Sequence, residues 1–348
     1  MHKPIATALL SYGMSGKIFH APLLHAHPGF VMTKVWQRNS QDARSRYPDV
    51  TVVSSLHDIL EDNSIELVIV NTPNHTHFDF AAKALEAGKH VVLEKPFTTD
   101  VKEGEKLITL AQQKRKILTV FQNRRWDGDF MAVKKIIKKK SLGHLVEFEA
   151  HYDRYRNYVE ANTWKEEPGK GVGILYNLGS HMIDQVLSLF GKPAAVDARL
   201  GIQRPGGKVD DYYDIRMEYP GLLVILKSSY LVREPGPRYI LHGVDGSFVK
   251  YGIDPQEQSL KDGVIPGTAG WGTEEKKYWG KLNTQVDGDH YEGLVETEPG
   301  NYLLFYDNVY EAVRDNKPLI VKPEESLQGI CVIEAALESN RLKKSISL

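Results

Sequence analysis

The feature that most constrains the fold is an alternation of short apolar runs with amphipathic segments along the first third of the chain. The apolar runs are short and rich in β-branched residues, which is typical of buried strands. They are residues 5–10, 30–36, 51–53, 66–71, 90–94 and 117–121. Apolar residues recur at helical spacing in residues 40–47, 55–63, 76–88 and 98–115. This alternation predicts a parallel sheet covered by helices on both faces, and we place this α/β domain at residues 1–122.

The middle of the chain follows a different pattern, in which apolar and polar residues alternate with period two. Glycine- and proline-bearing turns separate these segments, which are residues 144–155, 194–202, 212–219, 222–232, 238–244 and 247–253. Such patterning with short connections predicts a largely antiparallel sheet with one face toward solvent or a partner. Residues 257–300 suggest an irregular excursion, and helices are expected at about 302–314 and 323–342.

Charge and length exclude several classes of protein. The chain has 348 residues, so two domains are the natural expectation. Its 44 basic and 45 acidic side chains give a net charge of −1. Such a balance provides no long-range field to attract nucleic acid or an anionic membrane surface, and we expect neither as a partner.

The single cysteine and the length of the apolar runs limit the cellular compartments in which this protein is expected. Cys331 rules out an internal disulfide framework and a thiolate zinc cluster. Its surroundings, GICVIEAAL, predict an apolar helix with a buried thiol. No apolar run approaches the roughly 20 residues that a membrane span needs. The N-terminus lacks a basic head followed by an apolar stretch and a cleavage site, so we expect a soluble cytoplasmic protein.

The loop LLSYGMSGKIFH follows the first predicted strand and resembles a dinucleotide-binding turn. Gly13 and Gly16 fill the second and third glycine positions, which serve close pyrophosphate approach and helix packing. Ser11 fills the first, where serine is costly if the backbone needs a positive φ. An ordinary glycine-bearing loop is the alternative. The position after a strand of an alternating α/β pattern favours the dinucleotide site.

The end of the second strand indicates which dinucleotide is bound. NAD sites typically place an acidic residue about 20 positions beyond the turn, whereas NADP sites use arginine. Residues 37–39 are Gln, Arg and Asn, so Arg38 follows Gly16 by 38 − 16 = 22 positions without an acidic neighbour. A guanidinium there would stabilise a 2′-phosphate, so we predict NADP, with NAD less favoured. The alternative is that Arg38 only solvates the strand end.

Several longer stretches carry a more specific signal: SYGMSGKIFHAPLL, NTPNHTHFDFAAKALEAGKHVVLEKP, QNRRWDGDF and GSHMIDQ. Together they resemble the Gfo/Idh/MocA oxidoreductase family over almost the full chain. Within it the sequence is similar to the NADP-dependent scyllo-inositol dehydrogenase group, which shares HGVDGSFVKYGIDPQE in nearly this form. The resemblance implies a doubly wound Rossmann domain. It also implies an α+β domain at residues 123–348, whose open sheet forms a homodimer or homotetramer contact.

Four polar residues are the catalytic candidates. Lys95 follows the fifth predicted strand, at the edge where a doubly wound sheet presents ligands, and its ammonium can stabilise a developing alkoxide. His181 and Asp184 share one face of a predicted helix, where the carboxylate can orient the imidazole. The family uses this histidine to remove the hydroxyl proton. Many relatives have aspartate where this chain has Asn177, and an amide can hydrogen-bond a hydroxyl but cannot act as a base.

Each of these candidates could instead have a purely structural role. Lys95 would then be a surface lysine in a turn, and His181 would make a local cap with Asp184. His75 and His77 have no third ligand nearby in the sequence, so we expect no metal site and favour helix capping or cofactor contact.

The resemblance also implies a set of cofactor contacts. The positions carried over are Tyr12, Gly13, Met14, Ser15, Gly16, Arg38, Thr72, Pro73, Asn74, His77, Glu94, Lys95, Asn123, Trp164 and Lys165. Two departures weaken the last part of this set. Lys165 stands where the family often has arginine, which loses the planar fork, and Val172 interrupts a run of glycines.

Substrate contacts form a second set, which comprises Lys95, Tyr152, Arg154, Asn177 and His181. Tyr152 and Arg154 are predicted on one strand face and offer groups suited to a polyol, although an aromatic residue on a strand is more often core. Arg124 and Arg125 either line the cleft or tie the two domains together.

These features predict an NADP(H)-dependent oxidoreductase that acts on a secondary alcohol or ketone of a cyclitol or sugar. The best candidate pair is scyllo-inositol and its inosose. The alternatives are a general sugar or keto-sugar dehydrogenase, and a non-catalytic nucleotide-binding sensor with the same fold.

Overall fold

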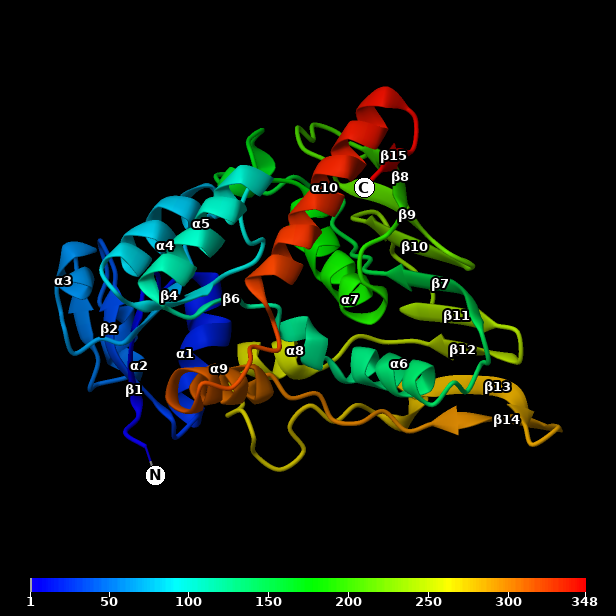
Figure 1. The fold of residues 1–348 in the computed structure, drawn as a ribbon, viewed down its shortest axis with the longest axis horizontal. Helices are drawn as coiled ribbons and strands as arrows, with labels where there is room; N and C mark the ends of the chain where they lie inside the picture. Colours follow the sequence, from blue (N-terminus) through cyan, green and yellow to red (C-terminus); the bar gives the residue numbers. More distant parts are fainter. Residues whose placement is uncertain (1) are drawn as a thin grey trace. The chain divides into compact units, whose positions relative to one another are not determined.

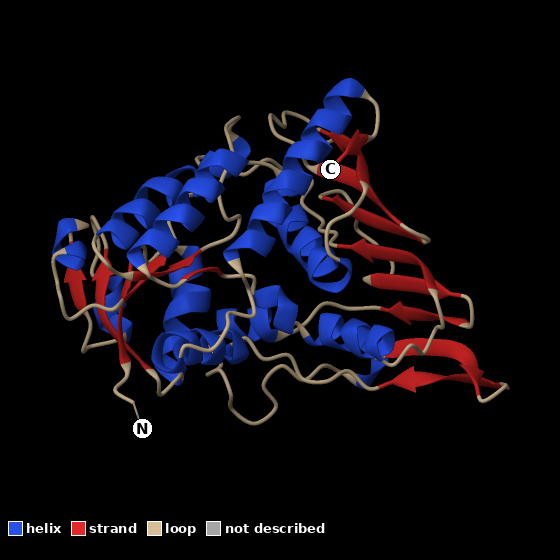
Figure 2. Ribbon diagram, in the orientation of Figure 1, coloured by secondary structure: helices blue, strands red, loops and turns tan. Residues whose placement is uncertain are grey.

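The structure of the chain, a computed structural model, describes residues 2–348. Figure 1 traces its elements along the sequence, and Figure 2 separates its helices from its strands. Contacts divide the chain into two compact units. The first contains the chain up to Trp126 together with Gln256–Trp271 and Asn301–Leu327. The second contains Asp127–Pro255, Gly272–Gly300 and Gln328–Leu348. Both units are therefore discontinuous in sequence, and the boundary at residues 122 and 123 stays a prediction.

Six parallel strands form the sheet of the first unit, in the order β3-β2-β1-β4-β5-β6. They are β1 (Ile5–Leu9), β2 (Phe30–Trp36), β3 (Thr51–Val53), β4 (Leu67–Val70), β5 (His90–Leu93) and β6 (Leu118–Val120). The order reverses between β1 and β4, where such sheets present ligands beyond the carboxyl ends of their strands. β1 and β4 are buried throughout, as expected of strands covered on both faces. The predicted doubly wound parallel sheet is confirmed.

Helices cover this sheet as the apolar spacing predicts. They are η1 (Gly16–His20), α1 (Ala21–Ala26), α2 (Asp42–Arg46), α3 (His57–Leu60), η2 (Asn74–Thr76), α4 (His77–Glu86), α5 (Val101–Lys114), η3 (Asn123–Trp126), α8 (Gln256–Lys261) and α9 (Leu303–Asp315). α4 and α5 lie side by side on one side of the sheet, whereas α1 and α9 lie on the other (Figure 1). Asp100 caps the start of α5, because its carboxylate accepts the Glu103 N–H, and the helix buries Gly104, Leu107 and Ala111 at helical spacing.

An aromatic cluster brings α9 into the first unit. The ring of Phe121, just beyond β6, lies 5.0 Å from Phe305 and 6.0 Å from Tyr306, both on α9. It also lies 6.4 Å from Phe19 on η1. These residues are almost completely buried, except that Phe19 is 9% exposed. Burial of such large rings is the main favourable contribution that α9 makes to this unit.

Gln256 joins three distant segments of the same unit. Its Oε1 accepts the indole N–H of Trp271 at 3.1 Å and the backbone N–H of Tyr302 at 2.7 Å. Its Nε2 donates to the carbonyl of Trp126 at 3.1 Å. The side chain is fully buried, so these bonds satisfy polar groups that would otherwise be costly.

Nine strands form the sheet of the second unit, in the order β14-β13-β12-β11-β7-β10-β9-β8-β15. They are β7 (Leu145–His151), β8 (Ala195–Gly201), β9 (Tyr212–Tyr219), β10 (Leu222–Ser229), β11 (Tyr239–Gly243), β12 (Gly246–Lys250), β13 (Gly280–Val286), β14 (Asp289–Val295) and β15 (Ile346–Ser347). β7 and β10 pair in parallel and the other neighbours pair antiparallel. The predicted largely antiparallel sheet is confirmed.

Helices cover one face of this second sheet. The helical segments are α6 (Gly128–Lys138), η4 (Trp164–Glu166), η5 (Leu175–Gly179), α7 (Ser180–Phe190), η6 (Lys276–Tyr278) and α10 (Pro323–Leu342), the last of which begins in the first unit. The hydroxyl of Tyr213 on β9 donates to the sulfur of Met182 at 3.0 Å. That of Tyr239 on β11 donates to Gln185 at 2.9 Å. α7 therefore packs on the buried face of the sheet.

The expectation of an irregular segment at residues 257–300 is wrong. This segment contains α8 and the β13–β14 hairpin, which pairs along its full length. The hairpin turn is Asp287-Gly288, and both residues have positive φ, which is the pairing that a type I′ turn requires. β14 is exposed along most of its length, so it lacks the alternation that marks a strand. The Asp-Gly dipeptide was the available signal.

The expectation that Cys331 is buried is also wrong. The residue lies on a helix, α10, as predicted, but its side chain is only half-buried while Ile330 and Val332 beside it are buried. Among residues 2–348, no helix is long and apolar enough to span a membrane.

Candidate functional site

The loop after β1 has the features of a phosphate-binding turn. The Gly13 N–H donates to the hydroxyl of Ser11 at 3.1 Å, and the Lys17 N–H donates to the Gly13 carbonyl at 2.9 Å, which starts the helical segment. Ser11 is not among the residues with positive φ, so serine costs nothing at this position. Its hydroxyl instead stabilises the turn.

The two glycines have different structural roles. A Cβ on Gly16 would lie 2.4 Å from the carbonyl oxygen of Ser11 and 2.9 Å from the amide nitrogen of Asn71, so only glycine fits. A Cβ on Gly13 would meet only the Ser11 hydroxyl, at an ordinary 3.4 Å, and Gly13 is exposed. The backbone at Gly13 is thus open to a ligand, and this fits a bound pyrophosphate.

Asn71 supports this turn and was missed from the sequence. It follows β4, is buried, and its amide donates to the Ser11 carbonyl at 2.8 Å. The bond joins the carboxyl ends of β1 and β4, where the strand order reverses. A polar residue that ends an apolar strand was the only signal for it.

The remaining residues near the turn differ in their exposure. Arg38 follows β2 and is exposed, while Gln37 is held by the hydroxyl of Ser40 and accepts the N–H of Ala43. Met14 is 56% exposed. Tyr12 is buried, and burial raises the pKa of its phenol against the opposing charges nearby. No acidic side chain stands at positions 37–39 to receive a ribose 2′-hydroxyl.

His77 links the loops that follow β4 and β5. Its Nδ1 lies 2.8 Å from the carbonyl of Pro96, and its Nε2 lies 3.1 Å from the carbonyl of Thr72. It is fully buried, and burial lowers its pKa although the two carbonyls favour the protonated form. The structure thus gives His77 a bracing position between the two loops, and its cofactor contact stays a prediction.

The rest of the loop after β4 forms a tight turn. The hydroxyl of Thr76 lies 2.7 Å from the hydroxyl of Thr72 and donates to the carbonyl of Pro73 at 2.7 Å. Asn74 starts η2. His75 is exposed whereas His77 is buried, and the residues that the structure describes contain no group of three metal-ligating side chains.

A buried polar chain precedes Lys95. His20 Nε2 lies 3.1 Å from Oε1 of Glu94, and His20 Nδ1 lies 2.6 Å from the hydroxyl of Tyr306. The other carboxylate oxygen of Glu94 accepts the Lys95 backbone N–H at 2.9 Å. Burial would raise the pKa of Glu94, but the hydrogen bond and charge of His20, with the charge of Lys95, lower it to about 2. Glu94 is therefore ionised at neutral pH, directly before the half-buried Lys95.

The backbone around Lys95 is turned by a cis peptide bond between Lys95 and Pro96. Lys95 comes just after β5 and so lies at the carboxyl end of that strand, on the same edge of the sheet as Gly13 and Asn71. His20 and Tyr306 were not predicted, because the two residues are 286 positions apart and no local pattern connects them.

Asn123 is buried at the start of η3, directly after β6. Arg124 pairs with Glu257, and Arg125 donates to Glu325 at 2.9 Å. All four charged partners belong to the first unit. These two arginines tie distant segments of one unit together.

In the second unit, the predicted residues lie on η5 and α7, which run without a break. Asn177 is half-buried, and its amide donates to the hydroxyl of Tyr230 at 3.2 Å. His181 and Asp184 are 6% and 3% exposed and lie about one turn apart on α7. The predicted shared helix face is therefore present.

Asp210 fixes the start of this helical segment and was missed from the sequence. Its carboxylate accepts the Leu175 N–H at 2.9 Å, while its carbonyl accepts the Ile174 N–H. Burial raises the pKa of Asp210 to about 6 despite the bond from Leu175. Gly173 has φ +92°, and a Cβ there would lie 1.9 Å from the Asp210 carboxylate. Glycine is required at this position, although Val172 interrupts the family's glycine run.

Trp164 and Lys165 lie on the short helix η4, and both are exposed. Thr163 caps this helix, because its hydroxyl accepts the Lys165 N–H at 3.4 Å. Tyr152 and Arg154 lie just beyond β7 rather than on it. Tyr152 is fully buried, with its ring 4.6 Å from the Arg154 guanidinium and 4.2 Å from that of Arg238. Its role toward a substrate stays a prediction.

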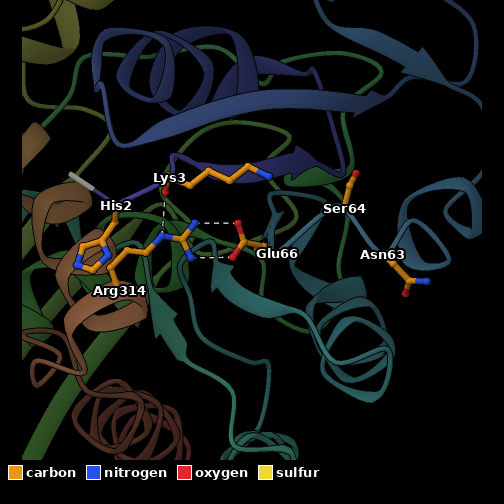
Figure 3. A pocket seen from close by; sticks show the side chains of 6 residues that line it. All are labelled: His2, Lys3, Asn63, Ser64, Glu66 and Arg314. Atoms are coloured by element: carbon orange, nitrogen blue, oxygen red, sulfur yellow. Dashed lines mark hydrogen bonds and ion pairs between the residues drawn. The ribbon is translucent and has the colours of Figure 1, made fainter.

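An open cavity of about 520 Å³ lies at the opposite, amino-terminal edge of the first sheet. Figure 3 shows it lined by His2, Lys3, Asn63, Ser64, Glu66 and Arg314, none of which is a predicted site residue. Arg314 donates to both carboxylate oxygens of Glu66, at 2.7 and 2.8 Å, and to the carbonyl of Lys3 at 3.0 Å. These bonds give the arginine a structural role.

Two family models match this chain. An oxidoreductase model with an NAD-binding Rossmann fold covers residues 5–122, and an oxidoreductase C-terminal alpha/beta domain covers residues 134–348. The chain belongs to the Gfo/Idh/MocA oxidoreductase family. It is therefore an NAD(P)-binding oxidoreductase of that family.

Similar proteins match the chain over its full length. It is 41% identical to scyllo-inositol 2-dehydrogenase (NADP(+)) IolW of Bacillus subtilis, over 99% of this chain and 96% of that one. It is 38% identical to the uncharacterised oxidoreductase YdgJ of Escherichia coli, over the whole of both chains. The solved structure of Bacillus subtilis yvaA aligns with TM-score 0.96 and 40% identity, over 99% of both chains. A Bacillus cereus oxidoreductase structure aligns with TM-score 0.91 and 33% identity, over 99% of this chain and 98% of that one.

Proposed function

We propose that this member of the Gfo/Idh/MocA family is an NADP(H)-dependent dehydrogenase of a cyclitol or sugar, with scyllo-inositol and its inosose as the leading substrate pair. The observation that carries the proposal is a single sheet edge that holds an open glycine backbone at Gly13 and an amine at Lys95. The identity to an NADP-dependent scyllo-inositol dehydrogenase supports the choice of substrate.

Arg38 supports the choice of dinucleotide. It is the exposed cation at the end of β2, where no acidic side chain competes for a ribose hydroxyl. A guanidinium in that place suits a 2′-phosphate. The backbone near Gly13 would hold the pyrophosphate, with Thr72, Pro73, Asn74 and Glu94 along the same edge.

Bound NADP(H) would supply the hydride acceptor or donor. The chain then has to hold the substrate and move one proton. Lys95 Nζ donates a hydrogen bond to the reacting oxygen and stabilises its developing negative charge. The imidazole of His181 accepts the hydroxyl proton, Asp184 orients that imidazole, and Asn177 hydrogen-bonds a neighbouring hydroxyl.

The experiment is turnover on a polyol and sugar panel, followed by the absorbance of reduced nicotinamide. Lys95→Met is expected to lower kcat at least about 100-fold while NADPH binding is retained. Lys102→Met is the matched control, because Lys102 is an exposed lysine on α5, which follows the same strand. Equal activity of the two variants would refute the role of Lys95. A preference for aldoses over inositols would favour a general sugar dehydrogenase.

A nucleotide-binding sensor is the second candidate, and one observation favours it. Asn177 stands where many relatives carry an aspartate, and its amide is engaged by Tyr230. A sensor would bind NADPH tightly and show no turnover across the whole panel. The same assay therefore separates the two functions.

We further propose that the open face of the second sheet forms a homodimer or homotetramer contact. Leu223, Ile225, Ile240 and Val249 are half-buried on the face opposite to the buried strand residues. Glu149 on β7 lies in register between Ile225 and Ile240, so this face carries apolar side chains together with charged ones, a composition that an interface between copies can have. Ile225→Glu is expected to shift the protein to monomers in analytical ultracentrifugation. An unchanged oligomer would contradict this interface.

A further inference from the structure

Arg204 is a buried charge outside the residues assigned above, and its guanidinium is bonded on several sides. It follows β8 and is 3% exposed. Its terminal nitrogens donate to both carboxylate oxygens of Glu166, at 3.0 and 2.8 Å, and one of them also donates to the Tyr158 carbonyl at 2.7 Å. Its Nε donates to Asp211 at 2.9 Å. The planar guanidinium suits this arrangement, because it presents several donors in a fixed fork.

The opposite side of the cluster is also rigidly built. Asp211 is fully buried and accepts the backbone N–H groups of Gln203 at 2.7 Å and Arg204 at 3.0 Å. The loop that carries Arg204 is therefore folded around the same carboxylate that holds its side chain. Arg204 is thereby fixed at its backbone and at its guanidinium.

Two predicted site segments meet at this arginine. Glu166 is the last residue of η4, which carries Trp164 and Lys165. On the other side, the Arg204 guanidinium lies 4.9 Å from the centre of the Tyr230 ring. The Tyr230 hydroxyl accepts the Asn177 amide at 3.2 Å. One guanidinium thus contacts the support of the predicted cofactor segment and the support of the predicted substrate amide.

We propose that Arg204 is a positioning residue that holds η4 and the amide of Asn177 in one fixed arrangement. The inference rests on the proposed function for the roles of Trp164, Lys165 and Asn177. The anchoring itself does not depend on that function. Arg204 touches neither cofactor nor substrate in this proposal, and it acts through Glu166 and Tyr230.

The chain offers a matched pair of variants. Glu166 and Glu167 are neighbours, and both form ion pairs with a cation from the same loop. Glu166 is 12% exposed in its pair with Arg204, whereas Glu167 is 61% exposed in its pair with Lys208. Glu166→Gln removes the buried charge pair, and Glu167→Gln removes only a solvated one, which contributes little. Arg204→Lys keeps the charge but removes the fork.

The test combines hydrogen exchange, NADPH affinity and turnover. Glu166→Gln and Arg204→Lys should speed amide exchange in residues 158–167 at least about tenfold and weaken NADPH binding about tenfold. kcat should fall at least fivefold as Asn177 loses its support. Glu167→Gln should change each quantity less than twofold. A thermal melt confirms that each variant is folded.

Each result has a defined meaning. Equal exchange in Glu166→Gln and Glu167→Gln would overturn the anchoring role. Faster exchange with unchanged NADPH affinity and kcat would overturn the positioning role and leave a structural one. If the unmodified protein turns over no polyol, the proposed function fails, whereas exchange and NADPH affinity still decide the role of Arg204.

Discussion

The two glycines of the turn after β1 provide a direct test of how the sheet edge is built. Gly16→Ala places a Cβ 2.4 Å from a backbone oxygen, which cannot move aside as a flexible side chain could. Overpacking of this kind costs about 1–3 kcal/mol. The Asn71 hydrogen bond to the same oxygen is also disturbed, which adds about 1 kcal/mol. We therefore expect Gly16→Ala to lower the free energy of unfolding by about 2–4 kcal/mol.

Gly13→Ala should behave differently. Its Cβ would make only an ordinary 3.4 Å contact with the Ser11 hydroxyl, and the backbone does not adopt a positive φ. Replacement of such a glycine by alanine restricts the unfolded chain, so stability should stay unchanged or rise by up to about 1 kcal/mol. The added methyl group nevertheless covers the open backbone that the pyrophosphate is proposed to approach. NADPH affinity should therefore fall at least about tenfold, although the fold is intact.

Urea unfolding followed by circular dichroism gives the stability, and NADPH fluorescence gives the affinity. We expect both variants to lose NADPH affinity and only Gly16→Ala to lose stability. A stable Gly16→Ala variant would refute the packing argument. A Gly13→Ala variant that binds NADPH as the unmodified protein does would refute the location of the pyrophosphate.

Three further predictions use charged residues. Because interactions hold the pKa of Glu94 near 2, its contribution to stability is complete above about pH 4.5 and is lost as pH falls toward 2. Glu94→Gln should therefore cost about 3 kcal/mol at pH 7 in urea unfolding. Asp307→Asn is the control and should cost less than about 1 kcal/mol, because Asp307 is the half-exposed partner of His27. Coincident unfolding curves would contradict this. Arg38→Ala should weaken NADPH binding about 10- to 100-fold in a fluorescence titration and leave the affinity for NADH unchanged. An equal loss of affinity for both dinucleotides would exclude a contact between Arg38 and the 2′-phosphate. Burial raises the pKa of Asp210, so the free energy of unfolding falls as pH rises from about 4 to 6. Asp210→Asn still accepts the Leu175 N–H and should remove up to about 3 kcal/mol of that fall. An unchanged pH profile of stability would contradict this prediction.

Much of the fold follows from short-range patterns. The buried strands of the first unit are short apolar runs between amphipathic helices, and a parallel sheet of such strands has both faces covered by helices. The β13–β14 hairpin escaped this reasoning, because β14 is exposed along most of its length and has no alternation to detect. Its Asp287-Gly288 turn was the better signal. The discontinuous units could not be predicted, because Gln256 meets Trp126 and Tyr302 only after the chain has folded.

In the candidate site, too, some residues could be predicted from the sequence and others could not. Gly13, Gly16 and Lys95 follow strands, so their common edge could be inferred from the strand pattern and the family motifs. The supporting residues could not. Asn71 and Asp210 act through single hydrogen bonds to backbone groups, and such bonds leave no periodic trace in a sequence.

The return of α9 to the first unit has a consequence for how the protein is made. As the chain leaves the ribosome, the Trp126 carbonyl has no hydrogen bond from Gln256 until that residue is synthesised, 130 positions later. Phe121 likewise stays uncovered until Phe305 and Tyr306 emerge, and Phe19 lacks its contact with Tyr302 until then. The nascent N-terminal half thus exposes apolar surface, and we expect chaperones to bind it. A recombinant fragment cut at residue 122 should aggregate for the same reason.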